Sequence, residues 1–387
     1  MPIEDWQGPR LLAEGFRPFF LAAGASAVAG VALWVLSLAG VIELDTFLAP
    51  VAWHAHEMIF GMAAAAVAGF LLTAVPNWTG RLPVRGWPLA GLVAIWLAGR
   101  IAMVLNVPGM GVVAAVVDLL FLLSLAGVAF REIAAGRNWR NLPVIAALVM
   151  LLAANGVTHA EALGYLNDDG TGLRLGVAVL IVLITLIGGR IIPSFTGNWL
   201  AKQVNEARPR AFGPYDRVCL IVTSIALAGW SVAPDSSAIS VTLITAGVLN
   251  GGRLASWRGH RTLGEPLVWS LHLGFFWVPI GLIMLGTSTF MSAVPTSAGV
   301  HALTAGAIGG MITAVMTRAT LGHTGRELHA DAVTAAIYGL VFVATVFRVG
   351  AGIAPGMFIE MLVASAAAWC GAFLIFCVRF GPHLAGR

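Results

Sequence analysis

Charged residues are scarce in this sequence. Asp, Glu, Lys and Arg make up 10% of its 387 residues, whereas roughly 25% is usual for a soluble domain. Hydrophobic residues make up 59%, so too few polar side chains remain to cover a water-soluble fold. The composition excludes a soluble enzyme or binding protein and predicts an integral membrane protein.

Cysteine is almost absent as well. The three cysteines, Cys219, Cys370 and Cys377, all fall within long apolar runs, and no CxxC pair occurs. Iron–sulfur clusters and c-type haem attachment depend on closely spaced cysteines. The sequence supports neither kind of site, so a bound metal is expected to use other side chains.

Long apolar runs occupy nearly the whole chain. About 20 apolar residues cross a bilayer as a helix, and backbone groups in lipid must pair internally. Twelve such runs are present, at approximately residues 19–41, 54–75, 87–105, 111–130, 142–163, 174–195, 216–233, 238–255, 266–286, 298–317, 332–350 and 356–378. We expect a single all-α integral membrane domain over residues 1–387, built as a bundle of about 12 transmembrane helices.

The basic residues predict the orientation of these helices. All but four of the 22 Lys and Arg fall at the termini or in the connections after the second, fourth, sixth, eighth and tenth runs. The exceptions are Arg100, Arg174, Arg190 and Arg348. Short cytoplasmic loops carry an excess of Lys and Arg, so both termini are expected in the cytoplasm. The basic balance therefore requires no nucleic-acid partner.

A short motif recurs near the cytoplasmic ends of the second, sixth and tenth runs. Thr-Gly next to a polar residue occurs at residues 79–81, 196–198 and 324–326. Thr-Gly is a common dipeptide, so chance recurrence stays open. The equal spacing of four runs favours three four-helix arcs in a pseudo-threefold arrangement.

Four histidines are expected at one depth, near the outward ends of three runs. His54 and His56 begin the second run, His159 ends the fifth and His301 begins the tenth. Histidine within a membrane span is costly and usually marks a site or a bundle interior. Imidazole binds iron, copper, zinc and nickel, so this level predicts a metal or cofactor site.

The stretch WHAHEMIFG (residues 53–61) holds two of these histidines and a glutamate. Residues two apart on a helix, at about 100° each, point to nearly opposite faces. His54 and His56 are therefore not expected to bind the same centre: one can reach an interior haem, while the other either serves a second site or forms a hydrogen bond outside. Glu57 has three possible roles: to orient a histidine ligand, to bind a metal itself, or to interact with the helix dipole.

Two sets of residues are candidates for a second metal site. His56 and His159, with Glu57 or Glu161, form the set on the outward side. His272 and His323 form the other set toward the cytoplasm, although His323 could instead cap its helix.

Intramembrane charges are expected near the outward set. Arg100 and Arg348 lie at the histidine level, where they either bind haem propionates or extend to the interface. Asp118 is expected to pair with Arg100 or to belong to a proton path. Asn155 precedes His159 by one helical turn, so a hydrogen bond between them is expected.

Four long segments are distinctive: WHAHEMIFG, GFLLTAVPNWTGR (69–81), EPLVWSLHLGFFWVPIGL (265–282) and HALTAGAIGGMITAVMTRATLGHTGREL (301–328). They carry a resemblance to the NnrS family of bacterial membrane proteins, and this resemblance runs across nearly all twelve runs. It implies a haem- and copper-containing protein of the bacterial inner membrane, associated with nitric oxide metabolism, denitrification and resistance to nitrosative stress.

A more distant resemblance is to the catalytic subunit of haem–copper oxidases and nitric oxide reductases. His54 precedes Met-Ile-Phe by four residues and His301 precedes Gly306 by five, as in the helices that hold their low-spin haem. The resemblance implies that His54 and His301 are the axial ligands of a haem b. Their further helix-10 histidine is replaced by Gly299, and residues 174–195 and 216–233 hold no histidine. A conventional oxygen-reducing oxidase is therefore not expected.

Three functions stay open from the sequence. The first is a haem or haem–copper protein that binds nitric oxide or a related small ligand, or transfers electrons from a donor. If it is an enzyme, it would be a haem-dependent oxidoreductase related to nitric oxide reductases. The second is a transporter, because twelve helices with both termini inside is a common transporter layout. The third is a haem-based sensor or stabilising protein without turnover.

Overall fold

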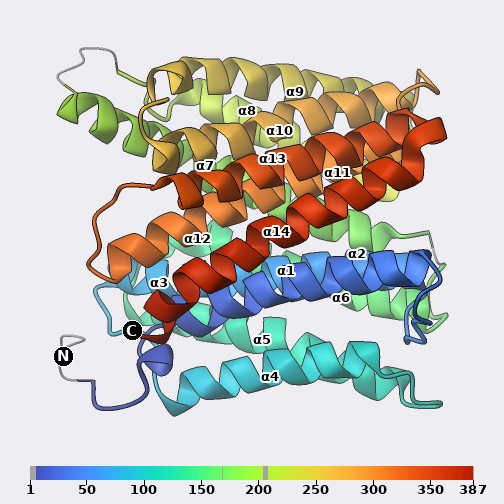
Figure 1. Cartoon of the computed structure of the whole chain (residues 1–387), viewed down its shortest axis with the longest axis horizontal. Coiled ribbons are helices and arrows are strands. Elements are labelled where there is room, and N and C mark those ends of the chain that lie inside the picture. The colour runs from blue at the N-terminus through green and yellow to red at the C-terminus, as the bar shows by residue number, and fades with distance from the viewer. Residues whose placement is uncertain (1–5, 168, 204–207, 387) are drawn as a thin grey trace. The chain divides into compact units, whose positions relative to one another are not determined.

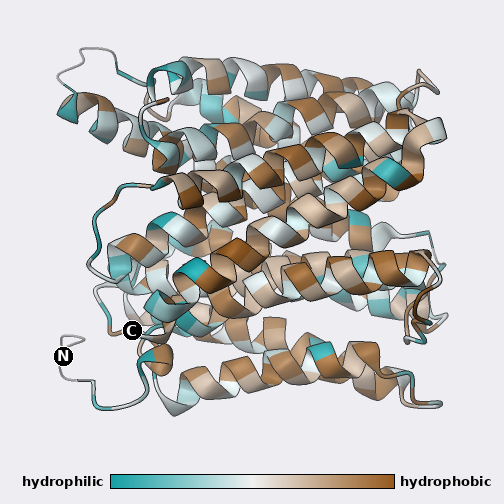
Figure 2. Cartoon of the chain, in the orientation of Figure 1, coloured by the Kyte–Doolittle hydropathy of each residue, from teal (hydrophilic) through white to brown (hydrophobic). Residues whose placement is uncertain are grey.

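The computed structural model describes all residues except 1–5, 168, 204–207 and 387. Over these described residues the chain is helical and has no β-strand. Twelve helices are long and apolar enough to cross a membrane. Figure 2 shows hydrophobic residues along the helices and hydrophilic segments in many of the connections. The expected all-α membrane bundle of about 12 helices is confirmed, and the chain is a multi-pass membrane protein.

Contacts divide the chain into two compact units. Unit 1 comprises Met1–Gly176, His323–Gly325 and Phe373–Arg387, and unit 2 comprises Val177–Gly322 and Arg326–Ala372. The α-helices wholly within unit 1 are α1 (Phe16–Leu38), α2 (Pro50–His56), α3 (Ala64–Thr79), α4 (Trp87–Val104), α5 (Gly111–Ala135) and α6 (Leu142–Ala162) (Figure 1). Unit 1 also contains the short segments η2 (Arg10–Leu12), η3 (Glu57–Ala63) and η4 (Trp139–Asn141). The prediction of a single domain and of three four-helix arcs stays a prediction.

Unit 2 contains most of the second half of the chain. Its elements are most of α7 (Thr171–Lys202), then α8 (Pro214–Val232), α9 (Ser237–Ser256), η5 (Gly259–Arg261), α10 (Pro266–Ser288), α11 (Thr296–His301), η6 (Ala302–Gly309), α12 (Gly310–His323, its last residue assigned to unit 1), α13 (Ala332–Ile353), η7 (Pro355–Met357) and the first half of α14 (Phe358–Ala385).

The second span begins earlier than the hydrophobic pattern predicts. Helix α2 starts at Pro50, at a position where the missing N–H of proline costs nothing. His54 and His56 therefore lie a full turn inside the helix and not at its first residues. The same span ends where Gly80 adopts a φ of 68°, a left-handed conformation that glycine takes without strain.

Two spans contain a π-helical segment directly after a histidine. Segment η3 follows His56 and segment η6 follows His301. π-helical turns are rare and occur frequently at functional sites, because they shift the side chains that follow. Both segments lie in the spans that hold the candidate haem ligands.

A polar contact joins the loop before α13 to the start of α10. Glu265 is buried, caps α10 by accepting from Leu267 N, and also accepts from Ala330 N and from His329 Nδ1 at 2.9 Å. The hydrogen bond and charge of Glu265 raise the pKa of the exposed His329, with Glu327 and Asp331 adding to the effect.

This contact should weaken as the pH rises. Because the pKa of His329 is raised in the folded state, its stabilising contribution is complete below the ordinary histidine pKa of about 6.5 and is lost as the pH passes through the folded value. Amide hydrogen exchange at Ala330, corrected for intrinsic rates, should be slower in the wild type than in His329→Gln at low pH. The two proteins should converge at high pH, and a constant difference would contradict this assignment.

Candidate metal centre

Three spans of unit 1 bring together three side chains that can bind a metal ion. His56 ends α2, Asp118 lies about two turns into α5, and His159 lies near the end of α6. One donor atom from each lies within 4.8 Å of the other two. All three side chains are buried, with exposed fractions of 0%, 1% and 2%. Buried ionisable groups at membrane depth are expensive and usually functional.

Asp118 is the centre of this cluster. Its Oδ2 lies 3.0 Å from His159 Nε2 and 3.2 Å from His56 Nε2. The same oxygen accepts a hydrogen bond from Asn155 Nδ2 at 2.6 Å. Its other oxygen, Oδ1, accepts from Arg100 Nη2. Both oxygens of this buried carboxylate therefore accept hydrogen bonds.

The ring of His56 is held on both sides by acceptors. Nδ1–H donates to Glu57 Oε1 at 3.1 Å. Nε2 faces the Asn155 side-chain oxygen at 2.9 Å and the Asp118 carboxylate. A nitrogen that faces only oxygens must carry a proton or a metal ion. A carboxylate that accepts from one ring nitrogen and so directs the other toward a metal is a common arrangement at metal sites.

Arg100 on α4 balances the two carboxylates of the cluster. Its Nη1 donates to Glu57 Oε1 at 2.5 Å, and its Nη2 donates to Asp118. A buried carboxylate without a partner would be strongly destabilising. Arg100 neutralises one of the two negative charges, and a cation at the histidines would neutralise the other.

Two glycines make room for these ion pairs. A Cβ on Gly61 would lie 2.9 Å from Arg100 Nη1, and a Cβ on Gly99 would lie 3.0 Å from Asp118 Oδ1. The carbonyl of Gly61 lies in η3, and it accepts a hydrogen bond from Trp96 Nε1 on α4 at 3.2 Å. The π-helical segment is thus tied to the helix that carries Arg100.

The model of one protein family matches nearly the whole chain. The match, described as NnrS protein, covers residues 10–387. The chain belongs to the NnrS family. A comparison with curated proteins found no match.

In this NnrS chain, several of the residues expected in the outward set lie in contact. His56, His159 and Glu57 lie together, and Asp118 pairs with Arg100. Whether they bind a metal stays a prediction. Glu57 contacts His56, its neighbour in the sequence, at 3.1 Å.

Two polar residues of α6 differ from expectation. Asn155 was expected to bond His159, but it bonds His56 and Asp118, because its amide reaches across to α2 and α5. Glu161 does not join the cluster. It accepts from Thr171 N at 2.8 Å and from Gly172 N at 3.2 Å, so it caps the start of α7.

The candidate haem ligands lie in different units of the NnrS fold. His54 is in unit 1, with its ring stacked on Trp34 at 5.3 Å between centroids. His301 is in unit 2, where Nδ1–H donates to the Ser297 carbonyl at 2.7 Å. This bond leaves Nε2 as the nitrogen with the lone pair, the state that a metal ligand requires. Pairing of the two histidines on one haem stays a prediction.

The inward candidates are also divided between the units. His272 Nε2 lies 2.8 Å from Thr196 Oγ1 in unit 2, while the His323 ring packs on Phe16 at 5.5 Å in unit 1. Their joint metal site stays a prediction. Arg348 Nη1 is buried and has no hydrogen-bond partner among the described residues, so an anionic group such as a propionate would suit it.

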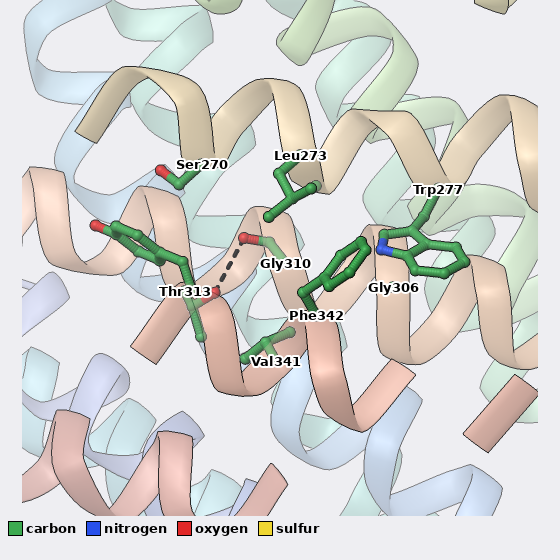
Figure 3. Close-up of a pocket in the computed structure, with 10 residues that line it drawn as sticks. Ser270, Leu273, Trp277, Gly306, Gly310, Thr313, Val341 and Phe342 are labelled. Atoms are coloured by element: carbon green, nitrogen blue, oxygen red, sulfur yellow. Dashed lines mark hydrogen bonds between the residues drawn. The ribbon is translucent and has the colours of Figure 1, made fainter. Parts of the chain in front are cut away.

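A small cavity in unit 2 is a weaker candidate for a site (Figure 3). It lies between α10, α12 and α13 and has room for about one molecule of the size of water. The rings of Trp277 and Phe342 lie 5.6 Å apart at one end, and Thr313 donates to the Gly310 carbonyl in the middle. None of the ten lining residues is a histidine, cysteine or carboxylate, so this cavity is not a metal site.

The sequence offered a partial signal for the role of Asp118. It is an acidic residue about two turns into a span, at the depth of the histidines. Depth can be read from the sequence, and it suggested an ion pair with Arg100. The approach of two imidazoles to the same carboxylate depends on how α2, α5 and α6 are rotated, which the sequence does not show.

Proposed function

We propose that this NnrS protein is a haem-containing metalloprotein of the bacterial inner membrane that acts in nitric oxide metabolism or resistance to nitrosative stress. The observation that carries the proposal is the buried cluster of His56, Asp118 and His159, held by Arg100 and Glu57 within a family member. All three side chains are buried, so a ligand that joins them must be small, as a diatomic molecule is. Both termini are proposed to be cytoplasmic.

Haem is proposed to bind through His54 and His301. The Nδ1 bond of His301 to a backbone carbonyl is typical of a histidine that ligates a metal through Nε2. The ring of His54 stacks on the indole ring of Trp34. A haem bound in this way would supply a one-electron centre for small-ligand or electron-transfer chemistry.

Copper is proposed as a second cofactor, because the resemblance to the NnrS family implies it. Imidazole suits copper, and so do mixed nitrogen and oxygen donors for its oxidised form. His272 and His323 are the candidate copper ligands outside the outward cluster. No electron donor is assigned.

The purified protein should show a haem spectrum. In detergent, it should have a Soret band, and reduction should sharpen an α band typical of a low-spin haem b. A fully extracted protein without a Soret band would contradict the proposal and favour the transporter alternative.

Cells that lack this protein should grow more slowly than the parent when exposed to a nitric oxide donor. Expression of the wild type should restore growth, because the proposed role is protection against nitrosative stress. A variant with Asp118→Asn should restore growth less well than one with His260→Gln, in which an exposed histidine is lost. Equal growth of all strains would contradict a role in the nitric oxide response.

A further inference from the structure

The donor atoms of the outward cluster form a recognisable metal-binding set. It consists of two imidazoles, His56 and His159, and one carboxylate, Asp118, without a sulfur ligand. Two histidines and one carboxylate on one face of a metal ion are typical of non-haem ferrous sites that keep coordination positions open for small ligands. Catalytic zinc sites also use two histidines and a carboxylate, so zinc is the main competitor for this set, whereas copper(I) favours soft sulfur ligands.

The distances from the carboxylate to both imidazoles fit ligands of one octahedral metal ion. Two atoms bound side by side to such an ion, at bond lengths of about 2.1 Å, lie about 3.0 Å apart. Asp118 Oδ2 lies 3.0 Å from His159 Nε2 and 3.2 Å from His56 Nε2. All three donor atoms lie within 4.8 Å of one another, so one metal ion could contact all of them after small side-chain movements.

The surrounding residues hold the three ligands in place. Glu57 accepts from His56 Nδ1 and so fixes the ring with Nε2 toward Asp118. Asn155 donates to the ligating oxygen of Asp118, and its own side-chain oxygen lies 2.9 Å from His56 Nε2. Arg100 binds the other oxygen of Asp118. Hydrogen bonds to the ligand side chains orient those ligands, and they usually strengthen metal affinity by 10- to 100-fold.

We propose that His56, His159 and Asp118 bind a non-haem ferrous ion that takes nitric oxide as an additional ligand. Three protein ligands leave up to three positions of an octahedral ion for small molecules. Nitric oxide binds by forming an iron–nitrogen bond, and this step needs no added oxidant or reductant. The nitric oxide part of the proposal rests on the proposed function, whereas the iron site does not.

The test is an iron count on the purified full-length protein. Metal-stripped protein is reconstituted without oxygen with ferrous iron, and with zinc and copper in parallel samples. Total iron minus haem iron should come to about one atom per chain. Asp118→Asn and His159→Gln should lose most of this iron, and His260→Gln should retain it. Zinc or copper retained in place of iron, or variants that retain iron like the wild type, would overturn the proposal.

Nitric oxide gives a second readout that does not depend on the variants folding. Added to the reduced, iron-loaded wild type, it should produce the high-spin ferrous nitrosyl EPR signal, which differs from the low-spin signal of a haem nitrosyl. Bound iron without this signal would overturn nitric oxide binding at the site. A missing haem spectrum would count against the proposed function and would leave the iron count unaffected.

Discussion

Replacing Asp118 with Ala should lower the free energy of unfolding by about 3–5 kcal/mol, the cost of breaking a buried ion pair by removing one partner. The change removes the acceptor of Arg100 Nη2 and of Asn155 Nδ2 and leaves His56 and His159 without their shared oxygen. Denaturation in mixed micelles, followed by tryptophan fluorescence, measures the effect.

Glu132 provides a matched control on the same helix. It pairs with Arg81 at 2.5 Å, but the Arg81 side chain is 46% exposed. Because water screens such a pair, Glu132→Ala should cost only about 0–1 kcal/mol. Equal losses for Asp118→Ala and Glu132→Ala would contradict the buried network described here.

The double variant Asp118→Leu with Arg100→Met separates lost charge from lost packing. It removes both members of the ion pair, so no unpaired charge remains buried. It should recover a large part of the stability lost in Asp118→Leu alone, since replacing both members of a buried pair by apolar residues is often close to neutral. Additive losses would show that Arg100 and Asp118 do not interact in the folded protein.

His54→Ala and His301→Ala should each abolish the low-spin haem spectrum, whereas His56→Ala should retain it. Loss of either axial ligand leaves the iron with a vacant or exchangeable position, which removes the sharp reduced α band. His56 is fully buried among Glu57, Asn155 and Asp118, so its replacement should affect the non-haem iron instead.

The same variants should separate the haem site from the non-haem iron site. His54→Ala should lose haem and keep the non-haem iron, and His56→Ala should keep haem and lose the non-haem iron. Haem and total iron are measured on one preparation of each variant, with His260→Gln as the control. Loss of the low-spin spectrum in His56→Ala alone would show that the assignment of His54 and His301 is wrong.

The helical architecture was largely predictable because the bilayer imposes it. A run long enough to cross lipid must pair its own backbone groups, so the twelve apolar runs predicted twelve helices. Their ends were less predictable. Helix α2 begins at Pro50, and α7 continues to Lys202, beyond the apolar run that predicted it. Apolar character marks where lipid lies, whereas helices continue into the interface.

The sequence predicted the membrane depth of the candidate site residues but not their side-chain contacts. Helix geometry predicted that His54 and His56 point to different faces, and the His54 ring stacks on Trp34 while His56 Nδ1 contacts Glu57. The sequence grouped Glu57 with His56 but did not predict the π-helical segment that begins at Glu57. Nothing in the sequence places Asn155 between His56 and Asp118, since that contact depends on three helices packing together.

The most direct test of the metal centre is a crystal structure of the iron-loaded protein with anomalous scattering measured at the iron edge. We predict a peak bounded by His56 Nε2, His159 Nε2 and Asp118 Oδ2, separate from any haem iron and at roughly 2.0–2.2 Å from each atom. No peak at this position, with the three side chains bonded to one another and iron bound elsewhere, would contradict the account.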